Sequence, residues 1–331
     1  MLHSFNTFYA GCITSVVDRG LTRADTLFIP HSLANGPGQL FSNMIPLYLG
    51  SQALIADTWD PGTHLDLLTE YGATGLQGAP VFIDAIAGEA RRRKQNLPRL
   101  RQVSTGTTTV PARLADTVRD AFGITLQTAW GMTEAMGPMR TSAINDPPDW
   151  AAHSVGRPHP GLEVQLRSGG EVSASIPARM FVRGASVCLA TMSRDGGEVY
   201  VVADHDDGWY DTGDLAVPDG RGGIRLMGRA ADRIGGTYMI PTADVEDALR
   251  QHPDIDDAAL VGYGPGNELA CAVVVSRKPL TLEKVRAYLD SLGMTDWYQP
   301  RRLELVDQLP RNPMGKVDKH TLRARLRDSV A

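Results

Sequence analysis

Short apolar runs alternate with amphipathic segments over residues 1–150. The apolar runs predict strands at 26–29, 52–55, 74–77, 100–103 and 124–129, and the segments between them predict helices near 37–49, 62–71, 80–95 and 111–122. In the last segment, Leu114, Val118 and Phe122 fall on one helical face. Alternation of strands and helices at this spacing is typical of an α/β fold with a doubly wound parallel sheet.

The pattern changes after residue 150. Gly, Asp and Pro recur between short alternating runs at 163–166, 180–183 and 197–202, which favours an antiparallel β-module such as a small β-barrel. Residues 229–331 predict helices capped by Thr242 and Thr281, strands at 257–263, 268–276 and 302–306, and a final charged helix. We therefore expect one domain over 1–227, with the α/β sheet in 1–150 and the β-module in 151–227, and a small, mobile α+β C-terminal domain over 228–331.

Composition argues against several classes of protein. The chain has 331 residues and a net charge of −5, whereas a nucleic-acid-binding domain normally shows a basic face. Three distant cysteines, Cys12, Cys188 and Cys271, lack the spacing of a zinc site and predict reduced thiols in a cytoplasmic protein. No apolar run approaches the roughly 20 residues of a membrane span, and we expect no signal peptide.

The stretch 128–134, Thr-Ala-Trp-Gly-Met-Thr-Glu, follows a predicted strand, where open α/β sheets bind ligands. Gly131 allows a sharp turn or a close approach to a ligand. Trp130 can cover a flat base, Thr133 can donate a hydrogen bond to phosphate, and Glu134 offers oxygen ligands to Mg²⁺. A strand followed by a glycine turn is common, and on its own it is more often structural.

Three later positions carry charges suited to a nucleotide. Asp214 follows a glycine and can accept two hydrogen bonds from a ribose diol, although an ordinary Thr-Gly-Asp turn is the alternative. Arg229 can bind phosphate or ribose oxygens or form a surface salt bridge. Lys316 follows a turn stiffened by two prolines and a glycine, which can present its ammonium to phosphate or carboxylate oxygens; a solvent-exposed lysine is the alternative.

Four motifs follow one another along the chain in this order: Trp-Gly-Met-Thr-Glu, Trp-Tyr-Asp-Thr-Gly-Asp, Gly-Arg-Ala-Ala-Asp and Pro-Arg-Asn-Pro-Met-Gly-Lys. Together they resemble the ANL superfamily, which comprises AMP-forming acyl-CoA synthetases, peptide-synthetase adenylation domains and luciferases, and the resemblance covers essentially the whole chain. It implies a ligase that works in two steps. A carboxylate first attacks the α-phosphate of ATP to give acyl-AMP and pyrophosphate. The small domain then rotates, and a thiol such as coenzyme A displaces AMP.

The resemblance also implies roles for individual residues. Lys316 would bridge the carboxylate and the α-phosphate, Thr133 would bind the α-phosphate, and Glu134 would bind Mg²⁺. His31 would lie near the acyl carboxylate or gate the pocket, with a structural role as the alternative. Trp130 would stack near adenine, and Asp214 would hold the ribose. The implied nucleotide-binding residues are Gly106, Thr107, Thr108, Trp130, Gly131, Met132, Asp214 and Arg229.

One family motif is missing, namely the phosphate loop Thr-Ser-Gly-Thr-Thr-Gly-x-Pro-Lys-Gly. Residues 104–111 imitate it without its lysine and second glycine, and their position before Trp130 matches the adenine-contacting loop of the family, so we expect Gly106 and Thr107 to lie against the base. The phosphate loop would precede His3. We therefore expect the N-terminal lobe to be absent from this chain and ATP activation by it to be weak. The family's hinge position falls at Ala231.

The substrate is expected to be a carboxylic acid, either fatty or otherwise apolar. Residues 77–83 and 129–131 should wall the acyl pocket, and they offer no lysine or aspartate to hold an amino acid. We expect no carrier domain after Ala331, which would favour coenzyme A as the thiol. The alternatives are an adenylation domain that loads a carrier protein and a non-catalytic nucleotide-binding remnant. An exposed sheet edge would favour a homo-oligomer, or a second chain that supplies the missing lobe.

Overall fold

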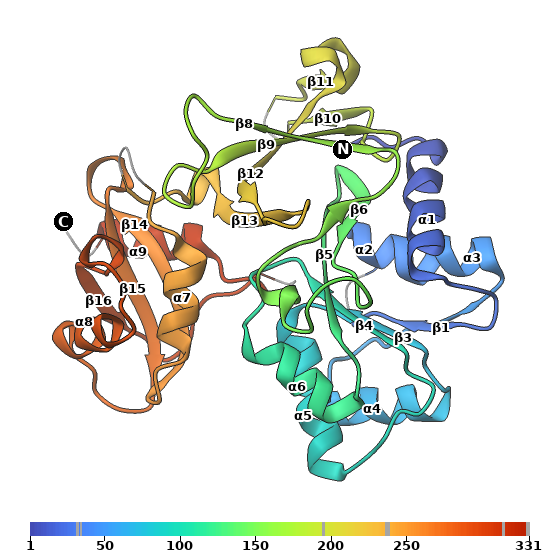
Figure 1. Ribbon diagram of the computed structural model, residues 1–331, viewed down its shortest axis with the longest axis horizontal. Helices are drawn as coiled ribbons and strands as arrows, with labels where there is room; N and C mark the ends of the chain where they lie inside the picture. The colour runs from blue at the N-terminus through green and yellow to red at the C-terminus, as the bar shows by residue number, and fades with distance from the viewer. Residues whose placement is uncertain (31–32, 34, 194–195, 236–238, 313–314, 329–331) are drawn as a thin grey trace. The chain divides into compact units, whose positions relative to one another are not determined.

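In the computed structural model, residues 1–30, 33, 35–193, 196–235, 239–312 and 315–328 are described (Figure 1). The predicted site residue His31 lies outside these residues. The chain divides into two compact units. The first contains Met1–Gln165, Phe181–Thr212 and Pro218–Arg225, and the second contains Leu166–Met180, Gly213–Val217 and Leu226–Ala331. The domain boundary at 227/228 stays a prediction.

A seven-stranded sheet in the order β2-β1-β3-β4-β5-β6-β7 organises the first unit. Strands β1 to β5 are parallel, as predicted, whereas β6 pairs antiparallel with β5 and β7 pairs antiparallel with β6. The strands are β1 (Thr26–Phe28), β2 (Gln52–Leu54), β3 (Gly75–Gly78), β4 (Gln102–Gly106), β5 (Leu126–Met132), β6 (Ala135–Arg140) and β7 (Arg157–Pro158).

Helices cover both faces of this sheet (Figure 1). One apolar core lies between the strands and α4, α5 and α6, and it includes Leu65, Ile83 and Val118. A second core lies on the other face, where Cys12 and Ile45 pack against β1 and β6. The helices are α1 (Phe5–Arg19), α2 (Gly36–Gln39), the π-helical η1 (Leu40–Met44), α3 (Ile45–Leu49), α4 (Pro61–Glu70), α5 (Pro80–Arg93) and α6 (Arg113–Phe122).

Helix α1 was not predicted from the sequence, although its ends carry standard signals. The Ser4 side chain accepts a hydrogen bond from the Thr7 N–H at 3.2 Å, and Gly20 ends the helix in the left-handed conformation. The helix packs on β6 at position 11, where a glycine has no side chain. A Cβ at Gly11 would lie 2.7 Å from the carbonyl oxygen of Met136. This glycine therefore allows the helix backbone to approach the strand closely.

Two motifs occupy different local structures from those predicted. Trp130 and Met132 belong to strand β5, which continues beyond the predicted end at 129. Met132 pairs with Ala135, so Thr133 and Glu134 form a tight two-residue turn between antiparallel strands rather than an open strand end. Asp214 likewise lies inside strand β12 rather than behind a turn, although the preceding Gly213 does have a positive φ of 78°.

Two smaller sheets occupy the region of the predicted β-module. The four-stranded sheet has the order β13-β12-β9-β8, and β10 pairs antiparallel with β11. The alternating runs at 163–166, 180–183 and 197–202 do contain strands, and the predicted fold class is confirmed. The strands are β8 (Leu162–Arg167), β9 (Ala178–Gly184), β10 (Ala190–Met192), β11 (Val199–Val201), β12 (Tyr210–Pro218) and β13 (Ile224–Arg229).

The C-terminal part of the second unit contains the three-stranded sheet β14-β15-β16, in which β15 pairs antiparallel with β14 and parallel with β16. Thr281 caps α8 as predicted, but Thr242 is the first residue of α7 and makes no capping hydrogen bond, because Pro241 holds the cap position. The elements are α7 (Thr242–Arg250), β14 (Ile255–Tyr263), β15 (Leu269–Ser276), α8 (Leu282–Ser291), β16 (Arg302–Leu305) and α9 (Lys319–Asp328).

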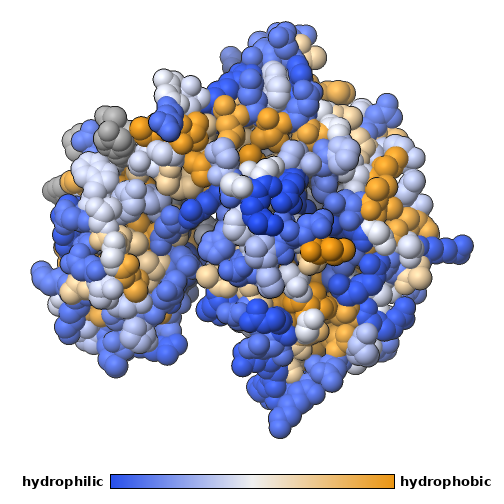
Figure 2. Space-filling view, in the orientation of Figure 1, coloured by the Kyte–Doolittle hydropathy of each residue, from blue (hydrophilic) through white to orange (hydrophobic). Residues whose placement is uncertain are grey.

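Apolar and aromatic side chains are exposed on the first unit over α1 and α3 (Figure 2). Phe5 is 71% exposed and Leu47 79% exposed, while the rings of Phe5 and Tyr48 both contact Tyr9. Exposed apolar surface of this kind is typical of an interaction site. The expected association with another chain stays a prediction. Among the described residues, no helix combines the length and apolar character needed to cross a membrane.

Substitution of Gly11 tests the close packing of α1 on β6. We expect Gly11→Ala to lower the free energy of unfolding by about 1–3 kcal/mol, because the new methyl group would meet strand backbone that cannot rotate away. Gly88→Ala is the matched control, because Gly88 is an exposed helical glycine with no atom near its Cβ position, and it should gain about 0.5–1 kcal/mol. Urea unfolding measures both values. Equal effects of the two substitutions would contradict the packing argument.

Candidate functional site

The predicted site residues fall into two groups, one in each unit. The first group comprises the end of β4 and the β5–β6 hairpin. Gly106 pairs with Ala129, and a Cβ at Gly106 would lie 2.2 Å from the carbonyl oxygen of Ala129. The approach of strand β5 therefore already requires a glycine at this position, independently of any ligand. Thr108, which was also predicted to bind nucleotide, is exposed and does not line the adjoining pocket.

Thr107 is strained and has an unsatisfied hydroxyl. Its φ is 69°, a conformation that a β-branched residue rarely adopts. Its Oγ1 atom is buried and has no hydrogen-bond partner among the described residues. Strain and orphaned polar atoms cluster at ligand-binding sites, where the surrounding structure maintains them. Thr107 therefore fits a loop that contacts a polar ligand, as predicted for the adenine-contacting segment.

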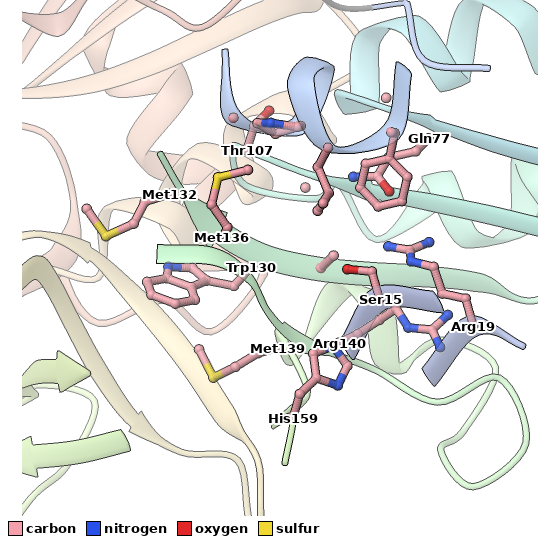
Figure 3. A pocket seen from close by; sticks show the side chains of 18 residues that line it. Ser15, Arg19, Gln77, Thr107, Trp130, Met132, Met136, Met139, Arg140 and His159 are labelled. Carbon is pink, nitrogen blue, oxygen red and sulfur yellow. The ribbon is translucent and has the colours of Figure 1, made fainter. Parts of the chain in front are cut away.

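A pocket of about 60 Å³ opens beside these residues (Figure 3). Trp130 lines it and is only 7% exposed, and Gly131 and Met132 continue the same wall. A volume this small is far below the ~300–1,000 Å³ of sites that enclose a whole drug-sized ligand. The lining residues are Ser15, Arg19, Gly36, Pro37, Leu40, Phe41, Gln77, Gly78, Gly106, Thr107, Ala129, Trp130, Gly131, Met132, Met136, Met139, Arg140 and His159.

Thr133 and Glu134 lie at the turn next to this pocket and do not line it. His3, which sequence reasoning did not select as a site residue, joins this turn to helix α1. Its Nε2 lies 2.6 Å from the carbonyl oxygen of Thr133, and its Nδ1 lies 2.8 Å from Thr7 Oγ1. Because both ring nitrogens are engaged, the imidazole fixes the turn relative to the helix. Its expected position directly after the family's phosphate loop was the signal that could have identified it.

The Cys188 N–H donates a hydrogen bond to the carbonyl oxygen of Glu134 at 2.7 Å. Burial raises the pKa of the Cys188 thiol to about 11 and that of the Tyr210 hydroxyl to about 12, and the negative charge of Glu134 adds to both shifts. Among the described residues, no three His, Cys, Asp or Glu side chains gather into a metal site. Mg²⁺ in nucleotide sites is often held by one or two carboxylates together with substrate phosphates, so Glu134 fits Mg²⁺ only when a nucleotide is bound.

All three cysteines are free and buried. Cys12 and Cys271 are fully buried, and Cys188 is 2% exposed. Burial raises the pKa of Cys12 to about 11 and that of Cys271 to about 12. Their thiols are therefore protonated at neutral pH, and none of them is activated as a nucleophile.

Three titratable side chains that line the pocket were not predicted, namely Arg19, Arg140 and His159, and Asp18 pairs with the last two. Arg140 Nε donates to Asp18 Oδ2 at 2.7 Å, and its Nη1 donates to Gln127 at 2.7 Å. His159 Nδ1 lies 3.6 Å from Asp18. The pocket wall was expected to be apolar, but helix α1 brings Arg19 to it. No local motif marks this group, because more than a hundred residues of sequence separate Asp18 and Arg19 from Arg140 and His159.

The second group brings together Asp214, Arg229 and Lys316. Asp214 is 4% exposed, and its Oδ1 lies 2.9 Å from Arg229 Nε. Burial lowers the pKa of the Lys316 ammonium, repulsion by Arg229 lowers it further, and Asp214 opposes the shift. The three side chains therefore share one partly desolvated environment with a net charge of +1. Such a group is suited to an anion, and Lys316 is not the solvent-exposed loop lysine of the alternative interpretation.

Side-chain contacts hold the segments that carry this second group. Asn312 accepts a hydrogen bond from the Lys316 N–H at 3.0 Å, and its own N–H donates to the Lys316 carbonyl at 2.8 Å. Arg323 of α9 lies 2.7 Å from Asp232 and donates to the carbonyl oxygen of Ala231. The predicted hinge segment is thus tied to α9 within its own unit, and its role as a hinge stays a prediction.

Replacement of Thr107 tests whether strain is stored at the pocket. We expect Thr107→Gly to raise the free energy of unfolding by about 1 kcal/mol, because glycine adopts a positive φ without strain. The neighbouring Thr108 has no positive φ, so Thr108→Gly should instead lower stability by about 0.5–1 kcal/mol through unfolded-state entropy. Chemical denaturation compares the two variants. Destabilisation by both would mean that position 107 stores no strain.

The pH dependence of stability tests the environment of Lys316. Its folded-state pKa lies below the unfolded value, so its buried charge destabilises the fold at neutral pH, and this cost is relieved as pH rises between the two pKa values. Lys316→Met should therefore be more stable than the wild type at pH 7, with an advantage that shrinks toward pH 10. The exposed Lys284→Met serves as the control. An advantage that is constant with pH would argue against a desolvated ammonium.

Comparisons with known proteins identify the family of this chain. Residues 1–190 match the family model described as AMP-binding enzyme, and residues 244–316 match that of the AMP-binding enzyme C-terminal domain. The chain is 29% identical over 311 residues to the medium-chain fatty-acid–CoA ligase of Escherichia coli, covering 92% of this chain and 54% of the relative. It is 29% identical over 285 residues to a salicyl-AMP ligase / salicyl-S-ArCP synthetase of Mycobacterium tuberculosis, covering 83% and 49%.

A solved structure with the same fold is the O-succinylbenzoate coenzyme A synthetase of Bacillus subtilis in complex with AMP. Its TM-score is 0.82 at 21% identity, covering 97% of this chain and 65% of that chain, and at this identity the likeness concerns the fold. The chain spans about half the length of the curated relatives that it matches. With the match over residues 1–190, the chain belongs to the AMP-binding enzyme family of the ANL superfamily.

Proposed function

We propose that this protein is an AMP-forming ligase that activates a carboxylic acid with ATP to acyl-AMP and transfers the acyl group to coenzyme A. The observation that carries the proposal is the grouping of Asp214, Arg229 and Lys316 in one partly desolvated environment of net charge +1. A phosphate attached to a ribose offers the anion and the diol that this group would bind. The family membership and the acyl-CoA ligases among its relatives support the same reaction.

Each residue of the second group has a defined task in this proposal. Asp214 would accept hydrogen bonds from the ribose hydroxyls, and Arg229 would hold the carboxylate of Asp214 in place while binding ribose or phosphate oxygen. Lys316 would neutralise the charge that develops between the attacking carboxylate and the α-phosphate. Its partial desolvation makes that charge–charge interaction stronger than it would be in water.

Residues of the first group would bind the rest of the nucleotide. Trp130 offers an aromatic wall, and the buried Oγ1 of Thr107 offers an unsatisfied hydroxyl to a polar edge of the base. Thr133 would bind the α-phosphate from the tight turn that His3 holds. Glu134 would hold Mg²⁺ together with the phosphates, and the ion would offset phosphate charge during the attack.

A carrier protein is the second candidate for the acyl acceptor. The salicyl-AMP ligase / salicyl-S-ArCP synthetase matches this chain at the same 29% identity as the fatty-acid–CoA ligase. Both acceptors use the same adenylation chemistry, so the residues assigned above serve either outcome. Detection of acyl-CoA after addition of coenzyme A to the acyl-AMP reaction would support the first candidate. Transfer only to an added carrier protein would support the second.

Substitution of Lys316 tests the adenylation step. We expect Lys316→Met to lower acid-dependent exchange between ATP and pyrophosphate by about 10²–10³-fold, because one charged group that stabilises a transition state contributes this much. Binding of AMP, measured by calorimetry, should change little, because Lys316 acts at the α-phosphate during attack. Asp214→Asn should weaken AMP binding about tenfold or more through the lost charge-assisted hydrogen bonds.

Control variants separate these roles from general damage. Lys284→Met removes an exposed lysine of the same unit and should alter neither exchange nor AMP binding. Absence of AMP binding by the wild-type chain would contradict a nucleotide site. AMP binding without exchange for any carboxylic acid would favour the non-catalytic alternative.

A further inference from the structure

The wall of the pocket in the first unit contains a cation that forms no ion pair with a carboxylate of the described residues. Arg19 ends helix α1, and its side chain reaches the pocket (Figure 3). Its Nη1 donates a hydrogen bond to Ser104 Oγ at 2.9 Å, and its guanidinium lies 4.7 Å from the centre of the Phe41 ring. Within the described part of the chain, no Asp or Glu oxygen lies within 4 Å of this guanidinium. A partly buried guanidinium in this setting is suited to an anionic partner.

Neighbouring groups do not supply that anion. Asp18 is the carboxylate beside this cluster, and Arg140 binds it both through Nε at 2.7 Å and through Nη2. Arg140 is therefore neutralised, and its third nitrogen donates to Gln127. Burial lowers the pKa of His159 below its usual value, with Asp18 opposing and both arginines assisting, so the imidazole is neutral at pH 7. Arg19 and Arg140 contribute two positive charges and Asp18 one negative charge, so the cluster has a net charge of +1.

Hydrogen-bond donors remain available around Arg19. Its Nε and Nη2 have no partner among the described residues, and together they present the two parallel donors that bind a carboxylate in bidentate fashion. Gln77 lines the same pocket, and its side-chain oxygen accepts a hydrogen bond from Ser104 Oγ at 3.3 Å. The Gln77 amide N–H groups have no partner in the described chain. They can therefore donate to the same anion.

The pocket also connects this cluster to the residues proposed to bind the nucleotide. Arg19 and Met132 lie on opposite sides of the pocket in Figure 3, with Trp130 between them in this view. An acid whose reacting carboxylate lies near the β5–β6 turn would therefore extend toward Arg19. A plain fatty acid would place methyl and methylene groups against an unneutralised guanidinium. That contact leaves the cation without compensation.

We propose that the acid activated by this protein is a dicarboxylic acid whose second carboxylate binds the Arg19 guanidinium, with Gln77 as a further donor. This inference rests on the proposed function, because it assigns the substrate class of the same ligase. Arg19 is a specificity-determining residue in this assignment. Because Asp18 pairs with Arg140, Arg140 does not compete with Arg19 for the second carboxylate.

The experiment compares acids that differ only in the second carboxylate. Binding to the purified chain in saturating AMP is measured by calorimetry for straight-chain dicarboxylates from malonate to suberate, and for benzenedicarboxylates, each against the monocarboxylate with the same carbon skeleton. We expect at least one dicarboxylate to bind about tenfold or more tightly than its partner, as one bidentate charge-assisted pair allows. Arg19→Met should abolish this preference. Arg23→Met removes an exposed arginine that does not line the pocket, and it should retain the preference.

The outcomes separate this inference from the proposed function. No preference for any dicarboxylate in the wild type, or a preference that survives in Arg19→Met, overturns the inference. If Arg19→Met fails to fold, Arg19→Lys is tested instead, because lysine keeps the positive charge and loses the bidentate geometry. The inference then requires that Arg19→Lys prefer the dicarboxylate over the monocarboxylate less strongly than the wild type does. AMP binding is measured separately in every variant, so loss of nucleotide binding by the wild type would contradict the proposed function instead.

Discussion

Helix α1 packs closely against the backbone of strand β6 because position 11 carries no side chain, and the arrangement of the first unit depends on this close packing. The helix presents His3 at its N-terminal end to the turn at Thr133 and Arg19 at its C-terminal end to the pocket. A bulkier residue at position 11 would shift both contacts together. One glycine therefore sets the relation between the turn that is proposed to bind phosphate and the cation that is proposed to select the acid.

Much of the fold could be predicted from the sequence because hydrophobic periodicity reports burial directly. The five parallel strands, the helices between them and the elements of the C-terminal part all occur close to their predicted positions. Helix α1 was missed because its buried positions include Thr7, Gly11 and Ser15, which do not form an apolar stripe. The hairpin at Thr133 was missed because strand β5 continues through residues that look like a loop, and because its pairing partner β6 follows the motif.

The candidate site could be predicted only where a local motif marks it. Asp214, Arg229 and Lys316 were each ambiguous alone, and the fold brings them into one charged environment. The cluster around Arg19 had no such mark. Its central pair, Asp18 and Arg140, is separated by 122 residues of sequence. Arg19 ends a helix, and nothing in the sequence around it distinguishes it from an ordinary surface arginine. Local patterns therefore identify chemistry shared with a family, whereas a cluster assembled by long-range packing leaves no local mark in the sequence.

The buried cysteines have a practical consequence for studying motion. Because all three thiols are shielded and protonated at neutral pH, maleimide reagents should spare them in the folded protein. One cysteine introduced at an exposed position in each unit, such as Val17 and Leu292, would then react selectively. A donor and an acceptor dye attached at these positions would report the distance between the two units in solution. Changes in that distance on addition of nucleotide could be followed without removal of any native residue.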